Sequence, residues 1–249
     1  MAENSKILSS PKYWLAPYAV FVSTLYLWGY WGSFHVNVLE FIGLSEIVKA
    51  AVYPIASTFA FFAIGAFLGE IFSPALNMPA GGGAETKIGK ILRKALPVIT
   101  CIYLLAVIFL FLIVRSPSKW QVLPALIAIP VYLWLKFTKL LVEDFKSDGA
   151  RSFVIFLLAA LPAFAYGKGV LKSNDILSGK EYAYVVSRLP GYSASSGVRV
   201  NELPRYLGKA GDRYVFVQPT NHQVLFVAAD KVKTLALKWY KRGHEVQPS

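Results

Sequence analysis

Cysteine and histidine are nearly absent from this chain, which restricts the chemistry that it can perform. The 249 residues include one cysteine, Cys101, and three histidines, His35, His222 and His244. A single cysteine excludes a disulfide within the chain, and histidines this scattered match no zinc-binding spacing. We therefore expect no metal ion and no cofactor, and we expect Cys101 to be a small packing residue within an apolar segment.

Motifs for catalysis are missing as well. The chain contains no GxSxG sequence of a serine hydrolase. The three glycines at 81–83 lack the lysine and the helix of a phosphate-binding loop, so they indicate a linker. Without a recognisable set of acid, base and nucleophile, the sequence predicts a protein that is not an enzyme.

Charged residues are scarce, at 16% of the chain, whereas 55% of the residues are hydrophobic. Soluble domains carry about a quarter charged residues. The shortage is confined to residues 1–171, because residues 172–249 have an ordinary soluble composition. We therefore predict two units, a transmembrane helical domain at 1–171 and a small soluble domain at 172–249.

Long apolar runs organise the first of these units. Residues 95–114 contain no charge, and as a helix they would cover roughly 30 Å, the thickness of the hydrocarbon core of a bilayer. Four other segments look similar, so the sequence predicts a polytopic α-helical membrane domain. The predicted spans are residues 13–32, 46–72, 95–114, 120–138 and 152–171.

Lysine and arginine are unevenly distributed around the ends of these spans, ten on one side and five on the other. The positive-inside rule places the richer side, with the N-terminus, in the cytoplasm of what we expect to be a bacterial inner membrane. Five spans then place the C-terminal domain on the opposite side. The net charge of +12 fits anionic lipid as a partner, and nucleotide or nucleic acid only if this domain is cytoplasmic.

Residues 180–240 show the alternating pattern of short strands. Turns are expected at 209–212 and 219–222, with one helical turn at 230–232 before a last strand at 234–240. A sheet of four or five short strands is easily closed, since closure removes its exposed edges. We therefore predict a small all-β domain, an SH3-like or Sm-like barrel, with a frayed end at 243–249.

The stretch between the first two predicted spans, residues 29–50, combines aromatic and polar residues. As a functional site it would be a gate, a lipid site or an assembly contact. As a purely structural element it would be an interfacial hairpin with aromatic anchors, and we favour this second interpretation. The candidate residues are Trp31, His35, Asn37, Glu40, Glu46 and Lys49.

The second predicted span carries two further candidates. Glu70 is a candidate intramembrane carboxylate, although a charged residue near the end of a helix more often reaches the head groups. Gly65 and Gly69 are four residues apart and would allow another helix to approach closely, which favours a homo-oligomer.

These features favour a non-enzymatic, oligomeric integral membrane protein. Its β module would sense or dock a partner, and its helices would form an anchor or a pore. A transporter or transporter subunit is the first alternative, because Pro54, Pro124 and Pro130 permit broken helices, although no inverted repeat is visible. An enzyme that acts on lipid through residues 29–50 or 73–94 is the second alternative.

Overall fold

A computed structural model defines the fold of the chain. It describes residues 11–50, 52, 56, 87–114, 117–137, 148–187, 189–190 and 199–242. Three predicted residues, Gly65, Gly69 and Glu70, lie outside the described residues, as do most of the predicted span 46–72 and the chain end 243–249. The chain divides into two compact units, one formed by residues 1–51 with 165–249 and the other by residues 52–164.

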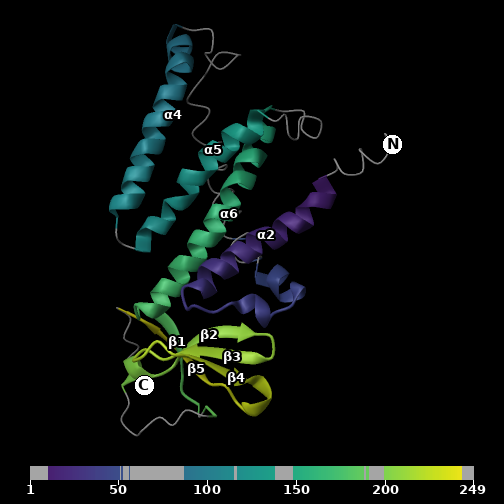
Figure 1. Cartoon of the computed structure of the whole chain (residues 1–249), viewed down its shortest axis with the longest axis vertical. Helices are drawn as coiled ribbons and strands as arrows, with labels where there is room; N and C mark the ends of the chain where they lie inside the picture. The colour runs from purple at the N-terminus through teal and green to yellow at the C-terminus, as the bar shows by residue number, and fades with distance from the viewer. Residues whose placement is uncertain are drawn as a thin grey trace, which may run out of the picture. The chain divides into compact units, whose positions relative to one another are not determined.

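The second unit is helical in its described part (Figure 1). Helix α4 (Lys87–Ile113) and helix α5 (Leu123–Phe137) are joined by the 3₁₀ turn η3 (Pro117–Gln121). Phe111 and Trp120 meet edge to face at this connection, with ring centroids 5.6 Å apart. Helix α6 (Asp148–Leu177) begins in this unit and ends in the other.

The prediction of five membrane spans is wrong. Among the described residues, only the α6 stretch Phe153–Leu177 is long and apolar enough to cross a bilayer, and half of it is buried inside the protein. The predicted span 120–138 fails because η3 takes its first residues, which leaves a helix of 15 residues, roughly 22 Å. The predicted span 13–32 is rich in tyrosine and tryptophan, and its second half is largely buried.

The first unit combines helix α2 (Pro11–Gly32), the 3₁₀ turn η1 (Val38–Glu40), the end of α6 and an antiparallel sheet. The strand order of this five-stranded sheet is β4-β3-β2-β1-β5. Two further 3₁₀ turns, η4 (Val200–Glu202) and η5 (Ala229–Lys231), precede β2 and follow β4. The strands are β1 (Glu181–Val185), β2 (Arg205–Ala210), β3 (Arg213–Val217), β4 (Val224–Ala228) and β5 (Leu237–Lys241).

The strands and turns lie within a few residues of their predicted positions, but the predicted barrel is wrong because the sheet is open. Strands β4 and β5 each pair on one side only and form its two edges. One face carries a small core around Val185, Phe216 and Val227, which the half-buried residues Val232 and Leu235 help to cover. The other face packs on residues of α2 and α6. Because both faces are covered without closure, the sheet does not need to curl into a barrel to bury its apolar side chains.

Candidate functional site at the junction of helices and sheet

Helices α2 and α6 touch through two glycines. A Cβ atom on Gly169 would lie 2.7 Å from the Tyr30 nitrogen and would overlap the Tyr26 carbonyl oxygen. A Cβ atom on Gly29 would likewise overlap the carbonyl oxygen of Tyr166. Real Cβ atoms do not approach other atoms so closely, so this crossing of the two helices requires glycine on both sides.

Just beyond this crossing, the end of α2 is fastened to strand β2. The Tyr30 hydroxyl donates a buried hydrogen bond of 2.6 Å to the Leu207 carbonyl oxygen. The adjacent ring of Trp31 lies over Gly208, which has a positive φ of 151° and sits at a bulge in the pairing of β2 with β3. Any other residue would have a strained backbone at this φ. Glycine avoids that strain, and the indole ring packs against it.

The segment that follows α2 folds back onto the sheet. His35 turns the chain with a positive φ of 58°, and its backbone N–H donates to the Gly32 carbonyl oxygen at 3.1 Å. The ring of Phe41 then reaches Phe226 on β4, with centroids 5.0 Å apart. Gly211, at the β2–β3 turn, passes so close to the Phe41 backbone that a Cβ atom would overlap its carbonyl oxygen.

Arg205 on β2 connects the sheet to the end of α6. Its side chain is only 9% exposed, and one guanidinium nitrogen, Nη1, donates to the carbonyl oxygens of Ile176 and Leu177, the second at 3.0 Å. These carbonyls lie at the C-terminal end of the helix, where Ile176 also accepts a hydrogen bond of 3.1 Å from the Gly179 backbone N–H. The cation adds to this capping and complements the negative end of the helix dipole. The guanidinium group also stacks over the Tyr182 ring at 4.4 Å.

Burial changes the acid–base behaviour of this cluster. Desolvation raises the pKa of Tyr182 above its ordinary value, an effect that the charge of Arg205 partly opposes. Desolvation also lowers the pKa of Arg205, although a guanidinium group stays charged in proteins. Burial raises the pKa of Tyr206 in the same way. All three groups therefore keep their ordinary ionisation state near neutral pH.

The predicted candidate residues have mainly structural roles here. Trp31 is buried against β2, and Glu46 accepts a 2.9 Å hydrogen bond from the Gly43 backbone N–H, which caps the helical turn at 44–50. Asn37 donates to Glu40 at 2.7 Å on the surface. His35 and Lys49 are exposed. The six candidates do not converge on one site. Cys101, which we expect to be a small packing residue within an apolar segment, is exposed on α4.

A shallow pocket of about 410 Å³ lies beside strand β4. Arg213 and Lys231 bring positive charge to it, and Phe226 forms part of its apolar wall. Asp212 pairs with Arg213 at 3.7 Å between exposed side chains. In the part of the chain that the structure describes, no group of three or more His, Cys, Asp or Glu residues could hold a metal ion.

The contacts at the junction hold the sheet and the two helices together. By junction we mean Gly29, Tyr30, Trp31 and Phe41 with Gly169, Arg205, Leu207 and Gly211. Its contacts are apolar stacking, buried hydrogen bonds to main-chain carbonyls and close backbone packing. These contacts fasten the sheet to the ends of two helices.

Of the residues at the junction, sequence reasoning named only Trp31 as a candidate. Gly29 and Gly169 are separated by 140 positions, so no local pattern pairs them. A glycine inside each apolar helix was the available signal, since glycine is costly there unless packing requires it. Arg205 was visible only as the first residue of a short strand that also carries Lys209.

Comparisons of the chain with known protein families, with curated proteins and with solved structures find no match. The proposed function therefore rests on the geometry of the chain alone.

Proposed function

We propose that this chain is a non-enzymatic, membrane-anchored protein in which a β module is held firmly at the membrane surface to dock a partner. The helices make contact with lipid, and the junction transmits force or orientation between them and the sheet. The proposal rests on three features, which are an apolar surface on the helices, a tightly fastened sheet, and contacts at the junction that are all structural.

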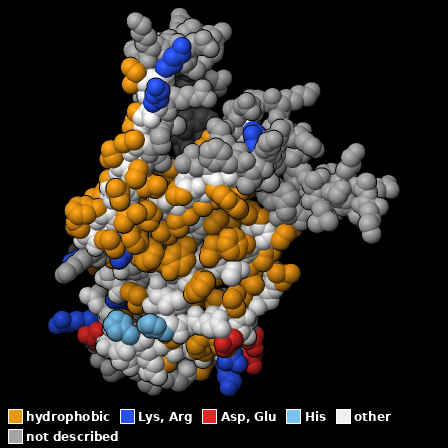
Figure 2. Space-filling view, turned by 45° about the horizontal axis from the view of Figure 1, so that its top comes forward, with side chains coloured by type: hydrophobic (Ala, Val, Ile, Leu, Met, Phe, Trp, Pro, Cys, Tyr) orange, Lys and Arg blue, Asp and Glu red, His pale blue; other side chains and the backbone are white. Residues whose placement is uncertain are grey.

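The observation that carries the proposal is the exposed apolar surface of α4. The side chains of Ile102 and Leu112 are 61% and 74% exposed, and most apolar residues between them are exposed as well. Figure 2 shows many hydrophobic side chains on the surface of the molecule. A soluble monomer rarely exposes an apolar surface along a whole helix, because water would drive it to associate. A bilayer or another copy of the chain would cover it.

Helix α6 supports an anchor in lipid. Its residues 153–177 form the apolar stretch noted above, and the helix continues directly into the exit turn of the sheet. An anchor that runs without a flexible linker into a folded module fixes the distance of that module from the membrane. We propose that the β module uses this fixed position to meet a partner at the surface.

Alkaline carbonate extraction tests the anchor directly. Membranes that contain the full chain are washed with carbonate at high pH, which releases peripheral proteins, and then with a nonionic detergent. We expect the chain to stay in the membrane pellet until detergent is added. Recovery of monodisperse protein in the carbonate supernatant, without detergent, would refute the proposed function.

The proposed oligomer needs a separate measurement. Chemical cross-linking in native membranes, followed by light scattering of the detergent-solubilised protein, should give a defined multimer at every protein concentration above its dissociation constant. A strictly monomeric species at all concentrations would remove the oligomer from the proposal but would leave the membrane anchor untouched.

A further inference from the structure

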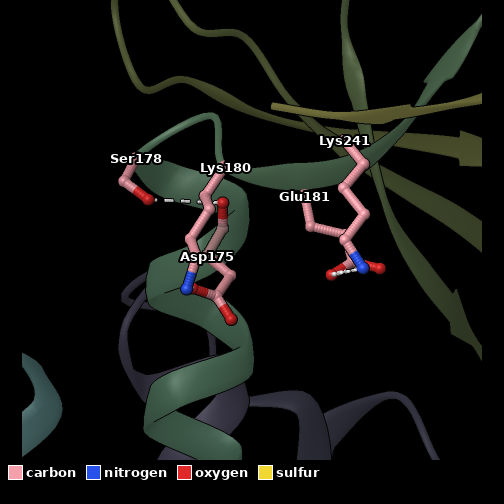
Figure 3. Close-up of polar contacts among 5 residues, drawn as sticks. All are labelled: Asp175, Ser178, Lys180, Glu181 and Lys241. Carbon is pink, nitrogen blue, oxygen red and sulfur yellow. Dashed lines mark hydrogen bonds and ion pairs between the residues drawn. The ribbon is translucent and has the colours of Figure 1, made fainter. Parts of the chain in front are cut away.

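The end of the described chain returns to the point where α6 leaves its apolar stretch. Helix α6 ends at Leu177, and a turn through Gly179, with φ of 68°, leads to Lys180 and strand β1. Strand β5 runs beside β1 so that Lys241 lies opposite Glu181. The Arg242 backbone N–H donates to the Lys180 carbonyl oxygen at 2.9 Å. Residues that are far apart in sequence therefore meet at the exit of the helix (Figure 3).

Positive charge predominates at this exit. Lys238, Lys241 and Arg242 are exposed on or just after β5, and Lys180 is exposed at the turn. Two acidic groups offset part of this charge, since Lys180 pairs with Asp175 at 3.4 Å and Lys241 pairs with Glu181 at 4.0 Å (Figure 3). Ion pairs between exposed side chains are worth little, so either lysine can leave its carboxylate for a phosphate.

An exposed tryptophan accompanies these cations. Trp239 lies two residues before Lys241 on the same face of β5, and its side chain is 74% exposed. Lys238, directly before Trp239, lies on the opposite face of β5, so both faces of this edge strand carry a lysine. A tryptophan next to lysine and arginine is typical of the membrane–water interface, where the indole ring and the cations both find favourable surroundings. We call Lys180, Lys238, Trp239, Lys241 and Arg242 the exit patch.

The position along the helix places the exit patch within reach of the membrane, if α6 is the anchor proposed above. Lys172 would lie near the head groups, because residues 172–175, toward the end of the 153–177 stretch, are polar. From Lys172 to Leu177 an α-helix rises roughly 8 Å, about one Debye length at physiological salt. Cations at this distance still feel the negative potential of a bilayer that contains anionic lipid.

We propose that the exit patch binds the head groups of anionic phospholipids and so holds the β module against the bilayer. The inference rests on the proposed membrane anchor and names the lipid that its surface recognises. The cations bind the phosphate, and Trp239 lies among the head groups beside them.

The test uses the full chain, purified in a nonionic detergent. Short-chain phosphatidylglycerol is titrated as the anionic probe and short-chain phosphatidylcholine as the neutral one, and bound lipid is counted by native mass spectrometry at two salt concentrations. The test variant is Lys238→Gln/Lys241→Gln/Arg242→Gln. The matched control, Lys209→Gln/Lys231→Gln/Lys233→Gln, removes the same charge from exposed positions elsewhere on the module.

We expect the wild-type chain to prefer phosphatidylglycerol and to lose that preference at high salt. Each cation near an anionic surface contributes a factor of about five in affinity, so the test variant should need at least about tenfold more phosphatidylglycerol. The control should stay within about twofold of the wild type, as should the charge-preserving variant Lys238→Arg/Lys241→Arg. Equal binding of the two lipids, or equal losses in both triple variants, would overturn the inference.

Two further measurements distinguish a failure of this inference from a failure of the proposed function. Thermal unfolding of both triple variants should match the wild type, since all the substituted side chains are exposed. The carbonate wash should still leave the test variant in the membrane. A variant that stays in the membrane but no longer prefers phosphatidylglycerol has lost the function of the exit patch and not the anchor. Tighter binding of a single-stranded oligonucleotide than of phosphatidylglycerol at the same salt would overturn the inference in favour of nucleic acid.

Discussion

Gly29 on α2 and Gly169 on α6 face each other where the two helices cross, and a side chain on either one would overlap the backbone of the other helix. This contact brings the end of α2 to strand β2, where Tyr30 and Trp31 attach to the sheet. The orientation of the β module therefore depends on the absence of a Cβ atom at both positions, which only glycine provides.

Substitution of Gly169 by alanine should disrupt this crossing. The new methyl group would meet the Tyr26 carbonyl oxygen and the Tyr30 nitrogen, which belong to helix backbone and cannot move aside as a side chain would. Overpacking of this kind costs typically 1–3 kcal/mol, so we expect a clear drop in the midpoint of thermal unfolding in detergent. Gly43→Ala is the control, because a Cβ atom there meets nothing within 4 Å. A Gly169→Ala midpoint equal to that of the control would contradict the tight crossing.

Removal of the Tyr30 hydroxyl tests the fastening of α2 to the sheet. In Tyr30→Phe the Leu207 carbonyl oxygen loses the 2.6 Å hydrogen bond of this hydroxyl in a buried place. A buried acceptor without its donor costs about 1–3 kcal/mol, which we expect to see in the free energy of unfolding. Limited proteolysis at the β2–β3 turn should accelerate as well. Tyr103→Phe removes a partly exposed hydroxyl from α4 and should change neither measurement.

Arg205 should matter more than the other arginine of the β2–β3 hairpin. Arg205→Met keeps the length of the side chain but removes the charged donor of the last two carbonyls of α6, of which only Ile176 also accepts from the Gly179 backbone N–H. Hydrogen bonds from a charged group contribute about 1.5–3 kcal/mol each, so a loss of about 2–3 kcal/mol in unfolding free energy is expected. Arg213→Met removes an exposed arginine that pairs weakly with Asp212, and we expect it to cost less than about 1 kcal/mol. Equal costs for the two variants would show that Arg205 does not cap the helix.

Stability should fall at alkaline pH because of the buried tyrosines of the sheet. Burial raises the pKa of Tyr182 and Tyr206 in the folded chain above the ordinary value near 10. Above that pH the unfolded chain loses protons that the folded chain retains, so the unfolded state is favoured as the pH rises. Each tyrosine contributes a slope of up to about 1.4 kcal/mol per pH unit, and none below its unfolded pKa. Chemical unfolding across pH 8–11 measures this slope, and Tyr182→Phe should make it shallower.

Local patterns in the sequence were sufficient to predict the strands, but they could not predict whether the sheet closes into a barrel. The alternation at Tyr182, Tyr184 and Val186 and the turn at 209–212 both mark elements that the sheet contains. Whether a sheet closes depends on what covers its faces, and here the cover comes from α2 and α6. Contacts such as Tyr30 to Leu207 join positions 177 residues apart, which no local periodicity records.

The span count failed for a related reason. An apolar run predicts burial, and it does not distinguish burial in lipid from burial against the rest of the chain. Tyr26 and Tyr30, which look like an interfacial aromatic belt, are instead buried in the protein, where Tyr30 bonds to the sheet. The stretch 29–50 could be singled out from sequence, with a structural role favoured, because its aromatic residues stand out locally. Its partner on the sheet could not be named from sequence.

The single cysteine provides an internal probe of the proposed lipid contact. Cys101 is exposed on α4 beside the exposed Ile102, so in water a hydrophilic maleimide would reach it readily. If lipid or another copy covers this face, the thiol in sealed membranes is shielded from such a reagent, and we expect labelling only after denaturation in a strong detergent. The variant Cys101→Ser/Lys209→Cys carries its thiol at an exposed position on the β module and should be labelled at once in open membranes. Equal labelling rates for the two thiols in membranes would place α4 in water and remove the main support for the anchor.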